Sequence, residues 1–336
     1  MKDKNITIID IAKQLGVSKS TVSRALKDHP DISKATKDRV NALAKKLKYK
    51  PNATAISFRQ QRSRIIGLIV PQISPFFFPS IIKAVEKEVH KRGYNLMILQ
   101  SGESEKRERD NLEILLHNNV DGILASVSRK TQNFDHFESL IEEHIPIVFF
   151  DRIPKNIKAD CVLIDDFDGA YRAVEHLIKT GRKKISICIG NPNLLISQNR
   201  LEAYKKALND YALPFDDNLV ISGESTLEAY KATDDLINSS HKTDSIFAIS
   251  DLTMSGVMQA IYKNNIQVPD KIAVIGFCES IFSKMYQPTL SYINPLGKKI
   301  GKKAAQLLLD RIDNEESQNS IKQILLSGEL VINGST

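Results

Sequence analysis

The chain has 336 residues, of which 42% are hydrophobic and 26% are charged, and its formal net charge is +7. This length and composition are those of a globular protein with two or three domains and a large buried core. No apolar run reaches the roughly 18 residues of a transmembrane span, and the N-terminal segment lacks an apolar signal-peptide core. We therefore expect a cytoplasmic protein without a membrane partner.

The positive charge is concentrated at the N-terminus. Residues 1–64 contain 16 Lys and Arg against 5 Asp and Glu, whereas the remainder contains 31 against 35. This asymmetry indicates a nucleic-acid-binding N-terminal domain on a mildly acidic body. Cys161, Cys188 and Cys278 are far apart and form no CxxC motif, so we interpret them as reduced, mostly buried hydrophobic residues. No metal site and no cofactor is predicted.

The segment Thr7–Leu26 predicts two short helices joined by a tight turn. Thr7 and Ser18 are suitable N-caps, and Gly16 supplies the turn because a positive φ costs glycine little. The first helix has one apolar face, formed at helical spacing by Ile8, Ile11, Ala12 and Leu15. In the second helix, Val22, Ala25 and Leu26 face the first.

The opposite face of the second helix is small, polar and basic, and it consists of Lys19, Ser20, Ser23 and Arg24. Such a face suits the DNA major groove, which a helix-turn-helix enters with the N-terminus of its second helix. The alternative from shape alone is a helical hairpin whose polar face is merely solvated.

A third helix is predicted from about Lys34 to Leu47, capped by Ser33. Its apolar residues repeat at helical spacing and would close a three-helix core. Six basic residues lie in or just after it, namely Lys34, Lys37, Arg39, Lys45, Lys46 and Lys48. Those that face a duplex would contact phosphates, and the others would form a solvated helix face.

Residues 49–64 read as a linker or a conditional helix, because the segment is too short and polar to form a stable helix alone. Phe58 is its one large apolar side chain. It either packs on the next domain or acts as a wedge at a minor-groove base step.

From Ile65 the pattern changes to alternating strands and helices. The first set of apolar strand-like runs is 65–70, 95–100, 122–127 and 145–150, and the second is 161–164, 184–190, 245–250 and 272–277. Strands that are apolar along their length imply parallel sheets covered on both faces. We therefore expect two doubly wound domains, with a ligand in the cleft at the carboxyl ends of their strands.

An enzyme or a transport receptor on the same α/β core is the alternative function. The chain contains no GxGxxG, GxxxxGK[ST] or GxSxG motif, and its seven histidines show no HExxH spacing. A receptor would also need an export signal. We therefore expect a non-enzymatic DNA-binding protein.

An ordered series of motifs resembles the LacI/GalR family of bacterial transcriptional regulators. It includes TIIDIAKQLGVSKSTVSRAL from Thr7, YKPN at 49–52, GLIVPQISPFFFPSI at 67–81, VDGILA at 120–125, VFFDR at 148–152, VEHLIKTGRKKI at 174–185 and VPDKIAVIGF at 268–277. The resemblance implies a helix-turn-helix headpiece, a hinge helix and a core like a periplasmic sugar-binding protein.

The implied boundaries are a headpiece at 1–50, a hinge at 51–64 and an effector-binding, dimerising core at 65–336. Within the core, the N-terminal subdomain would take about 65–161 and 292–318, and the C-terminal subdomain about 162–291 and 319–336. The implied function is a regulator, most often a repressor, that binds a near-palindromic operator in double-stranded DNA as a homodimer or tetramer. A small-molecule effector, of carbohydrate type, would control it.

The resemblance also implies DNA-contacting residues. Lys19, Ser20 and Arg24 match base-reading positions, and Arg24 can donate in bidentate fashion to guanine. The remaining matches position or contact the duplex: Thr7, Ser18, Thr21, Ser23, Tyr49 and Asn52. Phe58 replaces the leucine wedge that is usual in the family.

In the core, Phe76 and Phe77 match an aromatic wall of the effector cleft. Asp151, Arg200 and Asp251 match polar contacts, although Asp251 is equally suited to cap a helix and Arg200 to form a buried ion pair. The sequence departs from the family pattern at two positions: Cys278 replaces an acidic residue and Pro295 replaces a glutamine. Both changes remove polar contacts to the effector, and Asn294 would compensate for this loss. We expect a sugar with fewer polar contacts on one side, or one with a negative charge toward Arg200.

Overall fold

The computed structural model describes residues 6–49, 62–73, 76–154, 157–314 and 320–336. The chain divides into two compact units, Met1–Ser63 and Arg64–Thr336, and each is described by itself. Among the described residues, no helix combines the length and the apolar character that crossing a membrane requires.

The first unit is a three-helix bundle made of α1 (Ile8–Leu15), α2 (Lys19–Leu26) and α3 (Lys34–Lys46). Thr7, Ser18 and Ser33 are the N-caps, as predicted, and each side chain accepts a hydrogen bond from the backbone of the first turn. Gly16 ends α1 in the left-handed region at φ 65°. The helices bury a small apolar core: Ile11, Ala12, Val22, Ala25, Val40 and Ala44.

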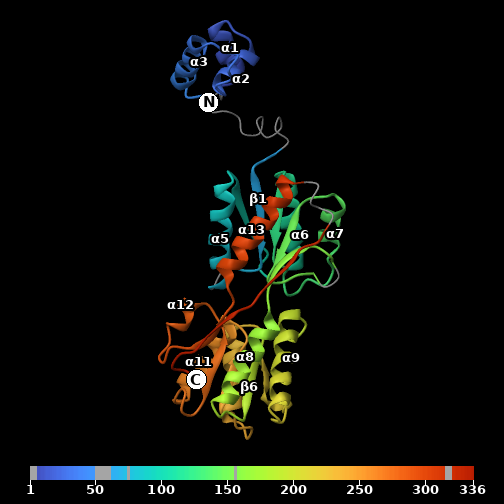
Figure 1. Cartoon of the computed structure of the whole chain (residues 1–336), viewed down its shortest axis with the longest axis vertical. Coiled ribbons are helices and arrows are strands. Elements are labelled where there is room, and N and C mark those ends of the chain that lie inside the picture. Colours follow the sequence, from blue (N-terminus) through green and yellow to red (C-terminus); the bar gives the residue numbers. More distant parts are fainter. Residues whose placement is uncertain (1–5, 50–61, 74–75, 155–156, 315–319) are drawn as a thin grey trace. The chain divides into compact units, whose positions relative to one another are not determined.

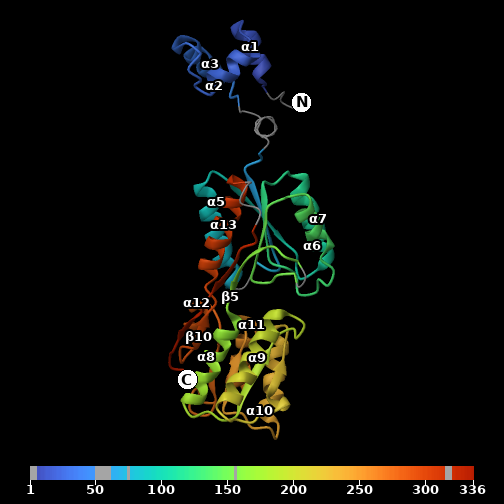
Figure 2. The same cartoon turned by 45° about the vertical axis from the view of Figure 1, so that its right-hand side comes forward.

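The second unit contains two six-stranded sheets, and the first has the order β11-β5-β4-β3-β1-β2. Its strands are all parallel: β1 (Ile65–Val70), β2 (Asn95–Gln100), β3 (Gly122–Ala125), β4 (Ile147–Phe150), β5 (Asp160–Ile164) and β11 (Gln323–Leu326). Helices α5 (Phe77–Lys91) and α13 (Gly297–Asp313) lie side by side on one face, and α6 (Glu105–His117) and α7 (Asp135–Glu142) cover the other (Figures 1 and 2).

The second sheet has the order β12-β10-β9-β8-β6-β7. Its strands are β6 (Ile185–Ile189), β7 (Val220–Ser222), β8 (Ser245–Ala248), β9 (Ala273–Phe277), β10 (Ser291–Asn294) and the antiparallel β12 (Glu329–Val331). Helices α8 (Asp166–Lys179) and α9 (Leu195–Asp210) pack together, as do α10 (Thr226–Asn238) and α11 (Asp251–Lys263). Two short helices complete this half, η1 (Asp217–Leu219) and α12 (Ser280–Ser283).

The central strands are apolar because both of their faces are covered. Strands β3, β4, β6, β8 and β9 are buried at every position. Helices α5 and α13 approach each other closely at Gly301, where a Cβ atom would lie 2.6 Å from the backbone oxygen of Ile81. The fold class, a helical headpiece with a two-sheet α/β core, agrees with the sequence prediction.

The chain passes between the two sheets three times, after β5, after β10 and after β11. These crossings differ from the expected subdomain boundaries. β5 pairs with β4 and β11 and so belongs to the first sheet, although residues from 162 were assigned to the second subdomain. β10 lies in the second sheet, and the segment 319–336, expected in the second subdomain, contributes β11 to the first sheet and β12 to the second. A buried strand has the same local pattern in either sheet, and only long-range pairing decides its place.

Candidate functional site

The exposed face of α2 is the candidate DNA-reading surface. Lys19, Ser20 and Arg24 are exposed, whereas Thr21 and Ser23 are half-buried. The Ser18 hydroxyl accepts a hydrogen bond from the Thr21 backbone at 3.0 Å and lies 2.7 Å from the Ser20 hydroxyl. Capping therefore fixes the small polar groups at the start of the helix, and Lys19 and Arg24 extend beyond them.

Arg24 is held only loosely. Its Nη1 lies 3.9 Å from Asp31 Oδ2, and both side chains are more than half exposed, at 57% and 62%. Such a pair contributes little in water, so the guanidinium is available to a guanine edge.

Lys37 behaves differently from the other basic residues of α3. Its ammonium group lies 2.7 Å from Asp28 and also donates to the Asp28 backbone oxygen at 3.2 Å, which ties the end of α2 to α3. The hydrogen bond and the positive charge of Lys37 hold the pKa of Asp28 below its ordinary value. The exposed basic side chains that remain are Lys34, Arg39, Lys45, Lys46 and Lys48.

The other expected DNA contacts have diverse surroundings. Thr7 and Asp10 form a reciprocal capping box, in which the Thr7 hydroxyl lies 2.7 Å from Asp10 Oδ2. Tyr49 packs, partly buried, against the core of the bundle. Asn52 and Phe58, with most of the expected hinge at 51–64, lie outside the described residues.

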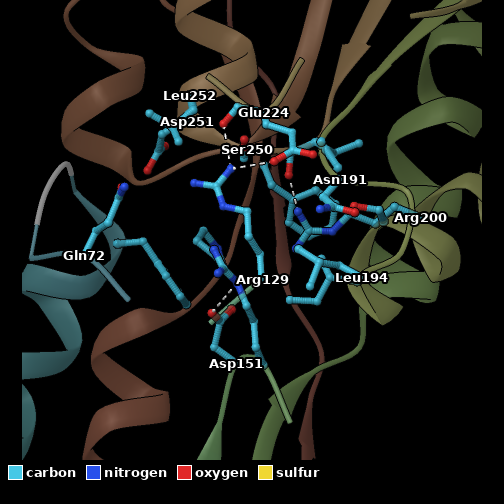
Figure 3. A pocket seen from close by; sticks show the side chains of 18 of the residues that line it. Gln72, Arg129, Asp151, Asn191, Leu194, Arg200, Glu224, Ser250, Asp251 and Leu252 are labelled. Carbon is cyan, nitrogen blue, oxygen red and sulfur yellow. Dashed lines mark hydrogen bonds and ion pairs between the residues drawn. The ribbon is translucent and has the colours of Figure 1, made fainter. Parts of the chain in front are cut away.

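In the second unit, a cavity of about 170 Å³ opens where the carboxyl ends of strands from both sheets meet. Figure 3 shows polar side chains that converge on it from loops and helix starts that follow these strands. From the first sheet come Glu103, Arg129, Asp151 and Arg152, and from the second come Asn191, Glu224, Ser250, Asp251 and Cys278.

Asp151 and Asp251 are carboxylates of this cavity that accept few hydrogen bonds from the described residues. Asp151 lies directly after β4 with φ 61° and accepts one hydrogen bond, from the Ser126 hydroxyl at 3.3 Å, and its Oδ2 also lies 3.8 Å from Arg152 Nε. Asp251 is 8% exposed and accepts one from the Glu279 backbone at 3.2 Å. Burial raises the pKa of Asp151 to about 6 and that of Asp251 to about 7. Both groups have acceptor capacity that faces the cavity.

The capping alternative for Asp251 is wrong in detail. Ser250 is the N-cap of α11 and forms a capping box with Thr253, and Asp251 is the first helical residue. Its side chain instead fixes the Glu279 backbone, 28 residues further along the chain.

Arg200 forms the buried ion pair that was the alternative to ligand contact. Its Nε donates to Asp166 Oδ1 at 2.8 Å, Nη2 donates to the same oxygen, and Nη1 donates to the backbone oxygen of Ile249. The guanidinium carbon lies 3.5 Å from the centroid of the Phe277 ring. Arg200 lines the cavity, but its guanidinium is already engaged on three sides.

The two other arginines are also paired. Arg152 Nη1 donates to both Glu103 oxygens, at 2.9 and 3.0 Å, and Arg129 Nε lies 3.3 Å from the same carboxylate. Arg129 Nη1 then reaches the Glu224 backbone oxygen at 2.9 Å (Figure 3). These contacts hold the pKa of Glu103 below its ordinary value despite its burial. A row of charged side chains, Arg152, Glu103, Arg129 and Glu224, therefore crosses the cavity from the first sheet to the second.

Two expected effector residues lie away from the cavity. Phe76 packs edge-to-face on Phe282, 5.4 Å between centroids, in the hydrophobic core beside the second sheet. The Asn294 side chain accepts a hydrogen bond from the Leu296 backbone at 3.0 Å and thus shapes the start of α13. Phe77 and Phe78 form the aromatic wall instead, and Cys278 and Pro295 line it as apolar positions.

Sequence reasoning missed Glu103, Arg129, Asp166, Asn191 and Glu224. Each follows a strand within a few residues, which is the signal that could have found them. The three cysteines are free and buried, as expected.

Comparisons with known proteins agree with this geometry. A family model described as bacterial regulatory proteins, lacI family, matches residues 7–52, and one described as periplasmic binding proteins and sugar binding domain of LacI family matches residues 63–329. The chain is 31% identical over 332 residues to the HTH-type transcriptional repressor PurR of Haemophilus influenzae (strain PittEE), covering 98% of each chain. It is 29% identical over 331 residues to the HTH-type transcriptional regulator DegA of Bacillus subtilis (strain 168), again covering 98% of each.

Solved structures share the fold. A transcriptional regulator CelR–cellobiose complex is similar at 25% identity and a TM-score of 0.75, over 98% of this chain and 100% of that one. The lac repressor dimer bound to operator and the anti-inducer ONPF is 21% identical, with a TM-score of 0.86 over 99% of each chain, and that likeness concerns the fold alone. The relatives are transcriptional repressors and regulators rather than enzymes, and the chain belongs to the LacI family of bacterial regulatory proteins.

Proposed function

We propose that this regulator reads operator DNA with the outer face of α2 and responds to an uncharged carbohydrate bound in the cavity between its two sheets. Residues 1–50 act as the DNA-binding domain, 51–64 as the hinge and 65–336 as the effector-binding core. Regulation of transcription places it in the cytoplasm, where the bacterial chromosome lies.

The DNA-reading role is supported by the combination of a capped N-terminus and exposed basic side chains on α2. Ser18 caps the helix, and Lys19, Ser20 and Arg24 are exposed. A bidentate contact of Arg24 to guanine supplies specificity, and exposed lysines of α3 supply phosphate contacts that add affinity without reading sequence. Asn52 and Phe58 would act from the hinge.

The carrying observation for the effector is the distribution of charge in the cavity. Arg129, Arg152 and Arg200 are each paired with a carboxylate of the protein, whereas Asp151 and Asp251 each accept a single hydrogen bond from the described residues, and Asp151 has in addition a longer ion pair, 3.8 Å, with Arg152 Nε. A ligand with hydroxyl groups can hydrogen-bond to these two carboxyl groups in either protonation state, whereas a phosphate or carboxylate would be repelled by whichever of them is ionised. A negative charge directed toward Arg200 is therefore disfavoured, and a neutral sugar is preferred.

Phe77 and Phe78 complete this chemistry with an apolar wall on which a sugar ring can lie. The similar CelR protein is described in complex with cellobiose, a neutral sugar, which supports the same ligand class here.

Effector binding would act on DNA affinity through the three chain crossings between the sheets. A ligand that contacts both sheets favours one arrangement of the two halves and so shifts its population. A homodimer would carry two headpieces and require a near-palindromic operator.

The test is selection of a preferred duplex from randomised DNA, followed by titration of that duplex with neutral sugars, sugar acids and sugar phosphates. We expect a neutral sugar to change operator affinity while acidic analogues have no effect. A response to the acids alone would overturn the effector class, and failure to select any sequence would overturn specific DNA reading.

A further inference from the structure

A second, larger chamber adjoins the cavity. It has a volume of about 640 Å³ and is lined by residues 127–132 and Phe134, by the segments that follow β4, β5 and β6, and by the starts of α8 and α9. Seven residues line both spaces, among them Arg129, Asp151 and Asn191, so the two spaces share a wall. We call the first space the inner pocket and the second the outer chamber.

The outer chamber exposes large apolar side chains. Phe167 is 40% exposed, Leu195 44% and Leu325 60%, and all three belong to its lining. They come from α8, α9 and β11, which are distant in sequence. Exposed apolar groups gathered in a concave surface mark a binding site rather than ordinary surface.

Phe167 is held in place from behind. Its ring stacks on Tyr171, with 6.5 Å between centroids and 17° between planes, and the Tyr171 hydroxyl donates to Asp210 at 3.0 Å. The face of the Phe167 ring that is turned away from Tyr171 is therefore a surface on which a flat ligand ring can stack.

Amide side chains lie around this platform. Gln132, Asn193 and Asn199 line the outer chamber, and their side chains form no hydrogen bond with other residues in the described part of the chain. Amides both donate and accept, which suits hydroxyl groups. A purely apolar ligand would leave them without partners, whereas a second sugar ring has an apolar face and a rim of hydroxyls.

We propose that the effector is a disaccharide, with one ring in the inner pocket at Asp151 and Asp251 and the other in the outer chamber on Phe167. The inference rests on the proposed carbohydrate effector and adds its size. Arg129 and Asn191, which line both spaces, lie beside the glycosidic link. Phe167 and Asn199 then determine specificity, since they contact only the second ring.

The experiment measures binding to the full-length protein by calorimetry and thermal shift. The probes are the disaccharides cellobiose, lactose, maltose and trehalose, the monosaccharides glucose and galactose, and phenyl β-glucoside. We expect one disaccharide to bind at least ten-fold more tightly than its constituent monosaccharides. Phe167→Ala should weaken that disaccharide about three- to ten-fold, the loss expected for one aromatic stack, and leave the monosaccharide unchanged.

Asn199→Ala should have the same selective effect, and Ile321→Ala serves as the control because Ile321 is 50% exposed but lines neither space. A monosaccharide that binds as tightly as every disaccharide would overturn the inference and leave the carbohydrate effector intact. Tighter binding of phenyl β-glucoside than of any disaccharide would also overturn it. If no sugar of either size binds, the proposed effector class itself is wrong.

Discussion

Arg129 and Glu224 connect the two halves of the core across the cleft. Arg129 follows β3 of the first sheet, and Glu224 follows β7 of the second. Arg129 Nη1 donates to the Glu224 backbone oxygen at 2.9 Å and lies 3.5 Å from the Glu224 carboxylate. Only 14% of the Arg129 side chain is exposed. The contact can exist only while the two sheets keep their present separation, so it stabilises this arrangement.

Arg129→Ala should loosen this arrangement of the two halves, because the loss of a charged hydrogen bond costs about 1.5–3 kcal/mol. We expect faster hydrogen exchange in the loops at 127–131 and 223–225, measured by mass spectrometry. Lys106→Ala is the control, since it removes a positive charge that is 87% exposed on α6. Equal exchange in both variants would show that the contact does not restrain the cleft.

Arg24→Ala should reduce specific DNA binding by about 1–3 kcal/mol and leave random DNA nearly unaffected, since a bidentate guanine contact is lost. Lys46→Ala, an exposed change on α3, should instead weaken all sequences alike and lower the salt dependence. Mobility-shift titrations on selected and random duplexes at several salt concentrations separate the two. Equal losses on both duplexes would mean that Arg24 meets only phosphates.

Arg200→Met should destabilise the core by about 3–5 kcal/mol, because it leaves the buried Asp166 carboxylate without its partner. The double variant with Asp166→Leu should recover much of this loss, since no charge is then buried alone. Urea unfolding of the single and double variants measures both values. A single variant as stable as the wild type would show that Arg200 is held for ligand contact rather than for structure.

Local sequence signals predicted the headpiece well. Caps at Thr7, Ser18 and Ser33 and the turn at Gly16 depend on residues within one helical turn, and the structure has all of them. Strand positions in the core were also visible, since buried parallel strands are continuous apolar runs. Their assignment to a sheet was not visible, because no local pattern shows where the chain crosses between the sheets, and β11 pairs with β5, more than 150 residues earlier in the chain.

The cavity shows the same limit. Asp151 and Asp251 could be predicted as strand-end residues. Whether the Arg200 guanidinium is paired within the protein depended on Asp166 and Ile249, which lie 34 and 49 residues away from it. Phe76 and Phe77 are neighbours in the chain, yet Phe76 enters the core beside the second sheet and Phe77 faces the cavity. Such choices follow from tertiary packing and have no local signature.

The raised pKa of Asp251, about 7, makes a prediction about pH and stability. Burial disfavours its charged form, so the folded protein holds a proton there that the unfolded chain releases near pH 4. Between pH 4 and pH 7 the native state therefore binds more protons than the unfolded state, and this group makes stability fall as pH rises. Asp251→Asn removes the titration, so the unfolding free energy of the variant should decline less steeply over this range than that of the wild type. Ser255→Ala, on the same helix, is the control and should keep the wild-type slope. Urea unfolding at half-unit pH steps measures the difference, and parallel curves for wild type and Asp251→Asn would show that Asp251 is ionised throughout.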